Sequence, residues 1–214
     1  PPTNRRPSFA AATSVVPLPH MKSATVAPGR ELARHGRRGR LVLLPDEHQR
    51  RRADLGEARA QVEDLTRSGW CFLPPFDDPA IIAGQGTLGL EILEDTPHVT
   101  DVIVSIGGGG MMTGVATAIK SMKPDVRIWG VETEGADCMS QSLSAGQIVT
   151  LDGARSVARA LGALAPSPTT FHAAQSLLEG VTVVPDDEAM DSLRFLLERM
   201  KILVEPASAC TVAA

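Results

Sequence analysis

The stretch VIVSIGGGGMMTG, residues 102–114, decides the fold. Its β-branched start is typical of a buried strand, four glycines follow, and the apolar residues after them suit a helix. Because glycine has no side chain, the N–H groups of residues 107–110 can converge on one point beside the positive end of that helix. The stretch therefore predicts a phosphate-binding turn. An empty turn is the alternative, although each glycine costs roughly 0.5–1 kcal/mol relative to alanine.

The spacing of these glycines argues against two common nucleotide-binding loops. It fits no G-x-G-x-x-G pattern, and Val115 and Ala116 follow Gly114 where a P-loop has Lys and then Ser or Thr. The interpretation of the chain as a nucleotide-binding α/β protein would therefore rest on the glycines alone.

Helical and strand patterns alternate on both sides of this stretch. Apolar spacing and Gly or Pro boundaries predict helices over residues 55–68, 80–95, 111–122, 139–144 and 187–200, and strands over 70–73, 102–105, 127–131, 181–184 and 202–205. A helix of small residues should follow the last strand. This alternation predicts an α/β fold, an open, largely parallel, twisted sheet with helices on both faces.

Two of these helices carry further signals. Three glycines, Gly84, Gly86 and Gly89, lie inside the expected helix 80–95, where each costs about 1 kcal/mol against alanine. Tight packing against another helix is the interpretation we favour. In the helix 187–200, the apolar residues expected on one face are Met190, Leu193, Leu197 and Met200.

Composition excludes several classes of protein. The chain has 214 residues, a net charge of −4 and 43% hydrophobic residues, and no apolar run reaches the roughly 18 residues of a membrane span. Cys71, Cys138 and Cys210 lie outside any C-x-x-C pair, so we expect reduced, mostly buried thiols and no disulfide or zinc framework. We expect a cytoplasmic protein that does not bind a membrane.

The charge is divided unevenly along the chain. Residues 1–52 hold 11 Lys and Arg against 3 Asp and Glu, a net +8, whereas residues 53–214 hold 10 against 22, a net −12. The basic segment has one aromatic residue and no nucleic-acid-binding motif, so we expect no nucleic-acid partner. We leave residues 1–52 unassigned, as a disordered or non-homologous segment.

A second candidate site lies in VETEGADCMSQSL, residues 131–143. Ligand sites of parallel sheets gather at the carboxyl ends of strands, where Glu132 is expected. With Glu134 and Asp137 nearby, oxygen ligands for a hard cation are available. A solvated acidic loop is the alternative.

Four blocks in this order resemble the threonine dehydratase and serine racemase family of pyridoxal-phosphate enzymes, which has the type II, tryptophan synthase beta-like fold. The blocks are PPFDDPAIIAGQGTLGLEIL, SIGGGGMMTG, GVETEGA and KILVEPASACTVAA. The resemblance implies pyridoxal 5'-phosphate as cofactor. It also implies deamination of a hydroxyamino acid, L-threonine or L-serine, to 2-oxobutanoate or pyruvate plus ammonia. A serine racemase-like activity is the alternative.

The resemblance also assigns roles to single residues. The residues implied to hold the cofactor are Gly107, Gly108, Gly109, Gly110, the backbone of Met111, and Glu205 near the cofactor ring. Glu132 and the Ala136 carbonyl match family positions that hold Mg²⁺ or Ca²⁺. The family's third ligand is an acid where this chain has Cys138, and Asp137 is adjacent.

The reactive part of the family's site has no match. Its Schiff-base lysine lies in an S-F-K-x-R-G-A block, whereas this chain's lysines are Lys22, Lys120, Lys123 and Lys201, all in other surroundings. We therefore expect no catalytic residue here and an inactive chain. A noncatalytic phosphate-binding or partner subunit is the alternative from another class.

The resemblance also sets the expected domain organisation. Residues 53–71 should be a remnant of the family's small domain, most of which is missing, and residues 72–214 should be the large cofactor-binding domain, incomplete at its C-terminus. The intact parent is expected to be a homodimer or homotetramer.

Overall fold

The computed structural model describes residues 40–42, 63–68, 70–72 and 74–214. The chain forms two compact units, one of Val15–Pro74 and one of Pro1–Ser14 with Pro75–Ala214. Most of the basic segment 1–52 and the first part of the expected helix 55–68 lie outside the described residues. No helix of the described residues is long and apolar enough to cross a membrane.

In the smaller unit, two short strands pair in parallel. β1 (Arg40–Val42) lies beside β2 (Trp70–Phe72), with Arg40 opposite Trp70. β2 confirms the strand expected at 70–73, whereas no strand was expected at β1. Residues 63–67 are helical, in agreement with the last part of the expected helix 55–68.

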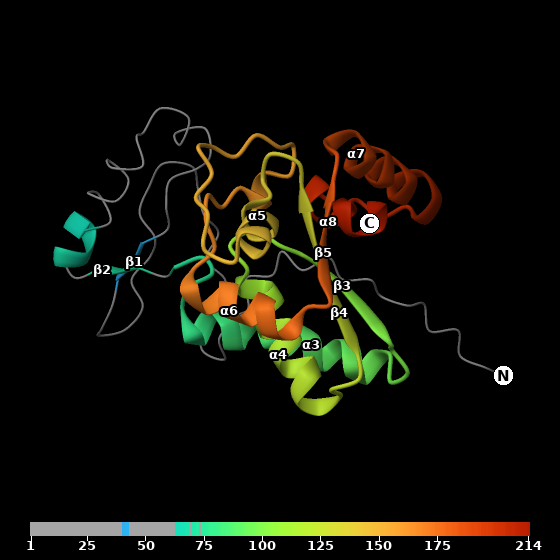
Figure 1. The fold of residues 1–214 in the computed structure, drawn as a ribbon, viewed down its shortest axis with the longest axis horizontal. Helices are drawn as coiled ribbons and strands as arrows, with labels where there is room; N and C mark the ends of the chain where they lie inside the picture. The colour runs from blue at the N-terminus through green and yellow to red at the C-terminus, as the bar shows by residue number, and fades with distance from the viewer. Residues whose placement is uncertain (1–39, 43–62, 69, 73) are drawn as a thin grey trace. The chain divides into compact units, whose positions relative to one another are not determined.

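The larger unit is built on a three-stranded parallel sheet (Figure 1). Its strands, in spatial order, are β3 (Asp101–Ser105), β4 (Arg127–Thr133) and β5 (Gly180–Val184). Asp101 is opposite Arg127, which brings the carboxyl ends of the strands to one edge. The expected open parallel α/β sheet is confirmed, and β4 runs two residues further than expected.

Helices cover both faces of this sheet, as expected. The helices are α3 (Pro79–Asp95), α4 (Gly110–Met122), α5 (Cys138–Ala145), α6 (Pro168–Leu177), α7 (Asp186–Phe195) and α8 (Pro206–Ala213). One core joins the sheet to α4 and α6 through Val104, Ile128, Val115 and Phe171. A second core joins the opposite face to α7 and α8 through Val131, Val184, Ala189, Ala207 and Cys210.

The α3–α4 contact explains two of the helix glycines. A Cβ on Gly89 would lie 2.9 Å from the Val115 carbonyl oxygen, and one on Gly86 would lie 3.1 Å from the Gly114 oxygen. The expected tight helix packing is confirmed at both positions. Gly84 faces open space, so packing does not explain it.

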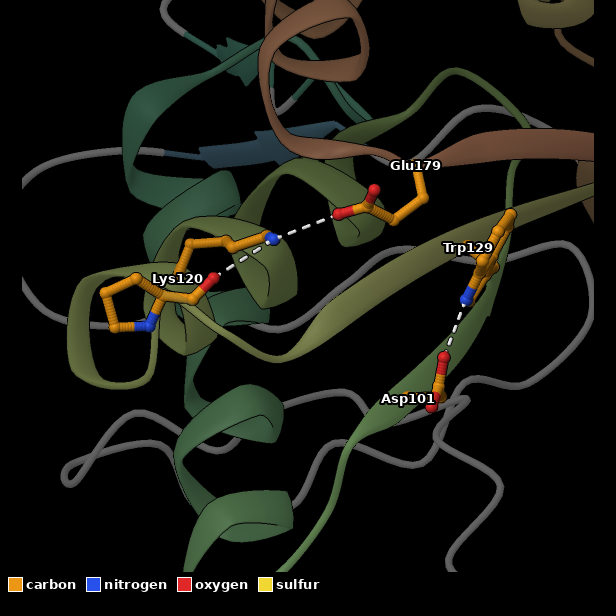
Figure 2. A network of polar contacts seen from close by, with 5 residues as sticks. Asp101, Lys120, Trp129 and Glu179 are labelled. Carbon is orange, nitrogen blue, oxygen red and sulfur yellow. Dashed lines mark hydrogen bonds and ion pairs between the residues drawn. The ribbon is translucent and has the colours of Figure 1, made fainter.

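Polar contacts secure the edge of the sheet opposite the carboxyl ends (Figure 2). The Asp101 carboxylate accepts a hydrogen bond from the Trp129 indole at 2.9 Å, which the figure shows. It also accepts one from the Arg127 guanidinium at 2.7 Å. Chiefly because of the Arg127 bond, the pKa of Asp101 lies well below its usual range. These bonds join β3 to β4 at the end where the strands begin.

The helix expected over 187–200 is interrupted, which corrects that prediction. α7 ends at Phe195, and a π-helical turn, η2 (Leu196–Met200), follows and ends at Lys201, whose φ is 57°. The wider turn breaks the 3.6-residue period on which the single helix was predicted.

The apolar residues expected on one face of that helix are largely exposed. The exposed fraction is 39% for Met190, 45% for Leu197 and 44% for Met200, and Leu193 is half-buried. Ala189 and Leu196 are the buried residues instead. Because Ala189 and Leu196 are seven positions apart, they lie on one side of a helix. The buried side of this helix is therefore next to the side that carries the four expected apolar residues.

The strand expected at 202–205 is absent, whereas the small-residue helix after it is present as α8. A strand requires a hydrogen-bonded neighbour, and no strand in the described part of the chain pairs with these residues. Leu203 is accordingly 81% exposed.

Candidate functional site

The four glycines form the turn between β3 and α4, at the carboxyl edge of the sheet. Gly109 is the N-cap of α4 and has a φ of 91°, a left-handed conformation that favours glycine. Its carbonyl accepts the first helical bond, from Thr113 N–H at 2.9 Å. On the strand side, Ile106 N–H donates to the Val131 carbonyl at 2.7 Å. Both ends of the turn are thereby fixed.

Phe76 packs directly on the turn. An added Cβ on Gly108 would lie 2.2 Å from the Phe76 ring, and one on Gly110 would lie 2.7 Å from the Phe76 Cα atom. Side chains at these two positions are therefore excluded. Phe76 belongs to the PPFDDP block that carried the family resemblance, but its contact with the glycines was not predicted.

Two further segments enclose the turn. A Cβ on Gly107 would lie 3.0 Å from the Leu161 Cα atom, and one on Gly109 would lie 2.8 Å from the Thr170 Cβ atom. Neither segment was predicted to have regular structure. The sequence did hold a signal for α6, since Ser167 and Thr170 form a capping box around Pro168.

The N-terminus of α4 offers hydrogen-bond donors that no described side chain caps. The N–H groups of its first turn, at Gly110, Met111 and Met112, have no acceptor within the helix. No described side chain caps this end, and its first turn holds no acidic residue. The Thr113 hydroxyl is buried and, within the described part of the chain, has no hydrogen-bond partner. These unpaired donors fit a phosphate group, which places negative charge at a helix N-terminus.

Glu132 is fully buried near the end of β4, where it binds the start of α5. Its Oε1 accepts from Met139 N–H at 2.9 Å and its Oε2 from Ser140 N–H at 2.7 Å. Burial raises the pKa of Glu132 to about 7, although both backbone bonds act in the opposite direction. The carboxylate therefore serves as a tertiary cap for α5.

The other residues of the expected metal site face different partners. Asp137 accepts a hydrogen bond from the Gln141 amide at 3.1 Å, and Ala136 is buried in a turn in which its N–H donates to Thr133. Among the described residues, no three His, Cys, Asp or Glu side chains gather as a metal would require. The expected cation site also uses the Ala136 carbonyl, which is not a side-chain ligand, so the roles of Glu132, Ala136 and Asp137 stay predictions.

Cys138 lies between this segment and the glycine turn. Its thiol donates a weak hydrogen bond to the Gly107 carbonyl at 3.8 Å, and burial raises its pKa to about 12. Burial likewise raises the pKa of Cys210 to about 11. Both thiols are free, as expected, and unsuited to nucleophilic chemistry because they remain protonated.

Glu205 is the N-cap of α8, and its side chain is exposed. Among the described residues it makes no side-chain hydrogen bond or ion pair. Within the described part of the chain, no hydrogen bond or ion pair joins its side chain to the glycine turn, so its place beside a cofactor ring stays a prediction.

The described lysines are engaged away from the turn. Lys120 binds Glu179 at 3.3 Å and the Pro124 carbonyl at 3.2 Å (Figure 2). Lys123 donates to the Pro97 carbonyl, and Lys201 donates to the Glu198 carbonyl at 2.7 Å. At 1.5 Å per residue, Lys120 is about 15 Å along α4 from its first residue. Lys22 lies outside the described residues.

An open parallel sheet with a glycine turn before a helix N-terminus is an arrangement that many phosphate-binding α/β proteins share. The family model described as "Pyridoxal-phosphate dependent enzyme" matches residues 19–214, so the chain belongs to this family.

The chain is similar to several named members of this family. The L-threonine ammonia-lyase of Thermotoga maritima is 41% identical over 158 residues, covering 74% of this chain and 39% of the relative. The L-threonine dehydratase catabolic TdcB of Escherichia coli K12 is 40% identical over 162 residues, covering 75% and 49%. The structure of maize serine racemase aligns with a TM-score of 0.73 at 33% identity, over 75% of this chain and 49% of that one. The chain thus spans less than half the length of each.

Proposed function

We propose that this chain supplies the phosphate-binding part of a pyridoxal-phosphate-dependent ammonia-lyase that deaminates L-threonine or L-serine to 2-oxobutanoate or pyruvate plus ammonia. The observation that carries the proposal is the first turn of α4, where backbone donors have no acceptor within the helix and the buried Thr113 hydroxyl has no partner among the described residues. The similarity to threonine ammonia-lyase and threonine dehydratase supports the reaction class.

In this proposal, the backbone N–H groups of Gly107–Gly110 and Met111 hold the cofactor phosphate. The left-handed Gly109 directs the turn so that the start of α4 faces the anion. Phe76, Leu161 and Thr170 enclose the glycines and keep water from competing for the same donors. The bound cofactor would supply an electron sink for the substrate's Cα carbanion.

We further propose that the chain alone does not catalyse the reaction. Schiff-base formation needs a lysine amine at the cofactor aldehyde, and the three described lysines are bonded at other places. These lysine contacts favour a second candidate function, a noncatalytic phosphate-binding or partner subunit. A serine racemase-like activity of a complete enzyme is the other candidate, supported by the maize structure.

The remaining predictions concern parts of the enzyme around this unit. We propose that Glu205 lies beside the cofactor ring, that residues 53–71 belong to a small domain and that residues 72–214 belong to the large one. We also propose a homodimer or homotetramer. A divalent cation at Glu132 is not part of the proposed function, because that carboxylate already caps α5.

Binding of pyridoxal phosphate and of pyridoxal, measured by calorimetry, tests the proposed phosphate site. We expect pyridoxal phosphate to bind at least about tenfold more tightly than pyridoxal. A tenfold difference in affinity corresponds to a difference of only about 1.4 kcal/mol in binding free energy. Gly109→Ala should remove this preference, since its Cβ would meet Thr170. Gly84→Ala is the matched control, because nothing lies within 4 Å of its added Cβ. Equal affinities for the two compounds would refute the phosphate site.

A further inference from the structure

A chain of hydrogen bonds joins three segments at the carboxyl edge of the sheet. The Ser156 hydroxyl donates to Asp186 Oδ1 at 2.7 Å, and Val157 N–H donates to Asp186 Oδ2 at 2.9 Å. The hydroxyl oxygens of Thr133 and Ser156 are 2.8 Å apart, and Ala158 N–H donates to Ser156 at 3.0 Å. The end of β4, the start of α7 and the loop before α6 thus share one network.

The hydrogen-bonding capacity of these groups fixes the direction of the chain. A hydroxyl has one proton and two lone pairs. Ser156 gives its proton to Asp186, so Thr133 must donate to Ser156, and Ala158 N–H fills the second lone pair. Thr133 is fully buried, and Ser156 and Asp186 are half-buried. A fully satisfied network in such surroundings holds its members in one arrangement.

The segment held by Asp186 is the one that touches the glycine turn. Residues 156–161 continue from Ser156 into a short 3-10 turn, η1 (Arg159–Leu161), in which Leu161 N–H donates to the Ala158 carbonyl at 2.9 Å. Leu161 Cα lies 3.0 Å from where a Cβ on Gly107 would be, and the Ala160 oxygen lies 3.2 Å from it. The segment therefore forms a wall against Gly107.

Apolar packing and the polar network hold this wall from both ends. Ala158 and Leu161 are buried in the core beside Val131 and Val184, whereas the wall's first residues are held by Asp186. The connection between α5 and α6, residues 146–167, contains no regular structure except η1. Long connections of this kind keep one conformation only where specific contacts fix them.

We propose that Asp186 is a positioning residue for the phosphate turn. Through Ser156 and Val157 it fixes residues 156–161 against Gly107, and so it sets the position of the first N–H group offered to phosphate. The inference rests on the proposed phosphate site. Asp186 does not touch the ligand itself, so its loss should weaken phosphate recognition without removing a ligand contact.

Asp186→Asn tests this role, with Asp187→Asn as the matched control. Both substitutions remove one negative charge from the first turn of α7, so both alter the helix-dipole interaction equally. Asp187 is exposed, and within the described part of the chain it accepts a hydrogen bond only from the N–H of its neighbour Glu188. Ser156→Ala should behave like Asp186→Asn, and Ser156→Thr, which keeps the hydroxyl, should restore the wild-type behaviour.

Two measurements are made on the full chain. Affinity for pyridoxal phosphate relative to pyridoxal should fall about fivefold to tenfold in Asp186→Asn, a usual size for coupling between sites, and stay unchanged in Asp187→Asn. Amide hydrogen exchange at residues 107–111 and 156–161 should accelerate only in Asp186→Asn and Ser156→Ala.

The outcomes separate this inference from the proposed function. If the wild-type chain shows no preference for pyridoxal phosphate, the phosphate site is refuted, and the exchange measurement still decides whether Asp186 orders the turn. If the preference is present but Asp186→Asn keeps it, or if exchange at residues 107–111 is unchanged, the positioning role is overturned.

Discussion

The two ends of α4 have opposite chemistry. At its start, the helix has glycines, a left-handed N-cap, no side-chain cap and a buried hydroxyl without a described partner. At its end, Lys120 and Lys123 bind carbonyl groups and Glu179. Stability alone would favour a capped start as well. The difference agrees with the proposed phosphate site at the start of α4, whereas the contacts at its end join the helix to neighbouring segments.

The largest effect should come from a side chain inside the glycine turn. Gly108→Ala would place a Cβ 2.2 Å from the Phe76 ring, so either the turn or the ring must move. We expect loss of phosphate binding and a decrease of about 1–3 kcal/mol in the free energy of unfolding, as for other overpacked sites. Urea unfolding and calorimetry measure the two effects. Binding retained at wild-type affinity would contradict the enclosed turn.

A side chain further along α4 should separate stability from binding. Gly114→Ala would bring a Cβ to 2.2 Å from the Ile82 carbonyl oxygen and force α3 away from α4. We expect about 1–3 kcal/mol lower stability and a preference for phosphate that stays within twofold of wild type, given that the protein is folded. Gly84→Ala, in open space on α3, is again the control. A loss of binding in the folded variant would show that the helix contact shapes the turn.

The tertiary cap at Glu132 should make stability depend on pH. The pKa of Glu132 is about 7 in the folded protein, against an ordinary value of 4.5 in the unfolded chain. Between pH 4.5 and pH 7 the folded protein therefore binds more protons than the unfolded chain does. The stability contributed by Glu132 is therefore highest below pH 4.5 and falls as the pH rises through 7. Glu132→Gln should remove a pH dependence on the order of 3 kcal/mol, measured as the difference between urea unfolding curves of the two proteins across this pH range. Parallel pH profiles would contradict the shift.

The smallest effect is expected at the far end of α4. Lys120→Met removes a partly exposed ion pair with Glu179, so the free energy of unfolding should fall by less than about 1 kcal/mol. Phosphate binding should not change. A marked loss of binding would show that the two ends of α4 are coupled and would break the contrast between them.

Patterns that local physics controls could be predicted from the sequence. The strand before the glycines, the helix after them and the α3–α4 packing follow from apolar spacing and from the cost of helix glycines. Features that depend on distant contacts could not. Phe76 reaches the turn from another part of the chain, and nothing in the local pattern of residues 202–205 shows that no neighbouring strand pairs with them.

In the candidate site, too, the local features could be predicted from the sequence and the distant contacts could not. Glycine chemistry predicts the phosphate turn, and Glu132 lies at the predicted strand end. Its hydrogen bonds from two N–H groups of α5 could not be predicted, and its role at a cation stays a prediction. The wall at residues 156–161 was missed because a loop without periodicity gives no sequence signal until its anchors, Ser156 and Asp186, are seen together.

The most direct test of the central claim, a phosphate site without a Schiff-base lysine, is borohydride reduction of the protein mixed with pyridoxal phosphate, followed by peptide mass spectrometry. We predict saturable binding that inorganic phosphate displaces, and no stoichiometric reduced adduct at any single lysine. A stoichiometric adduct at one of Lys22, Lys120, Lys123 or Lys201 would contradict it.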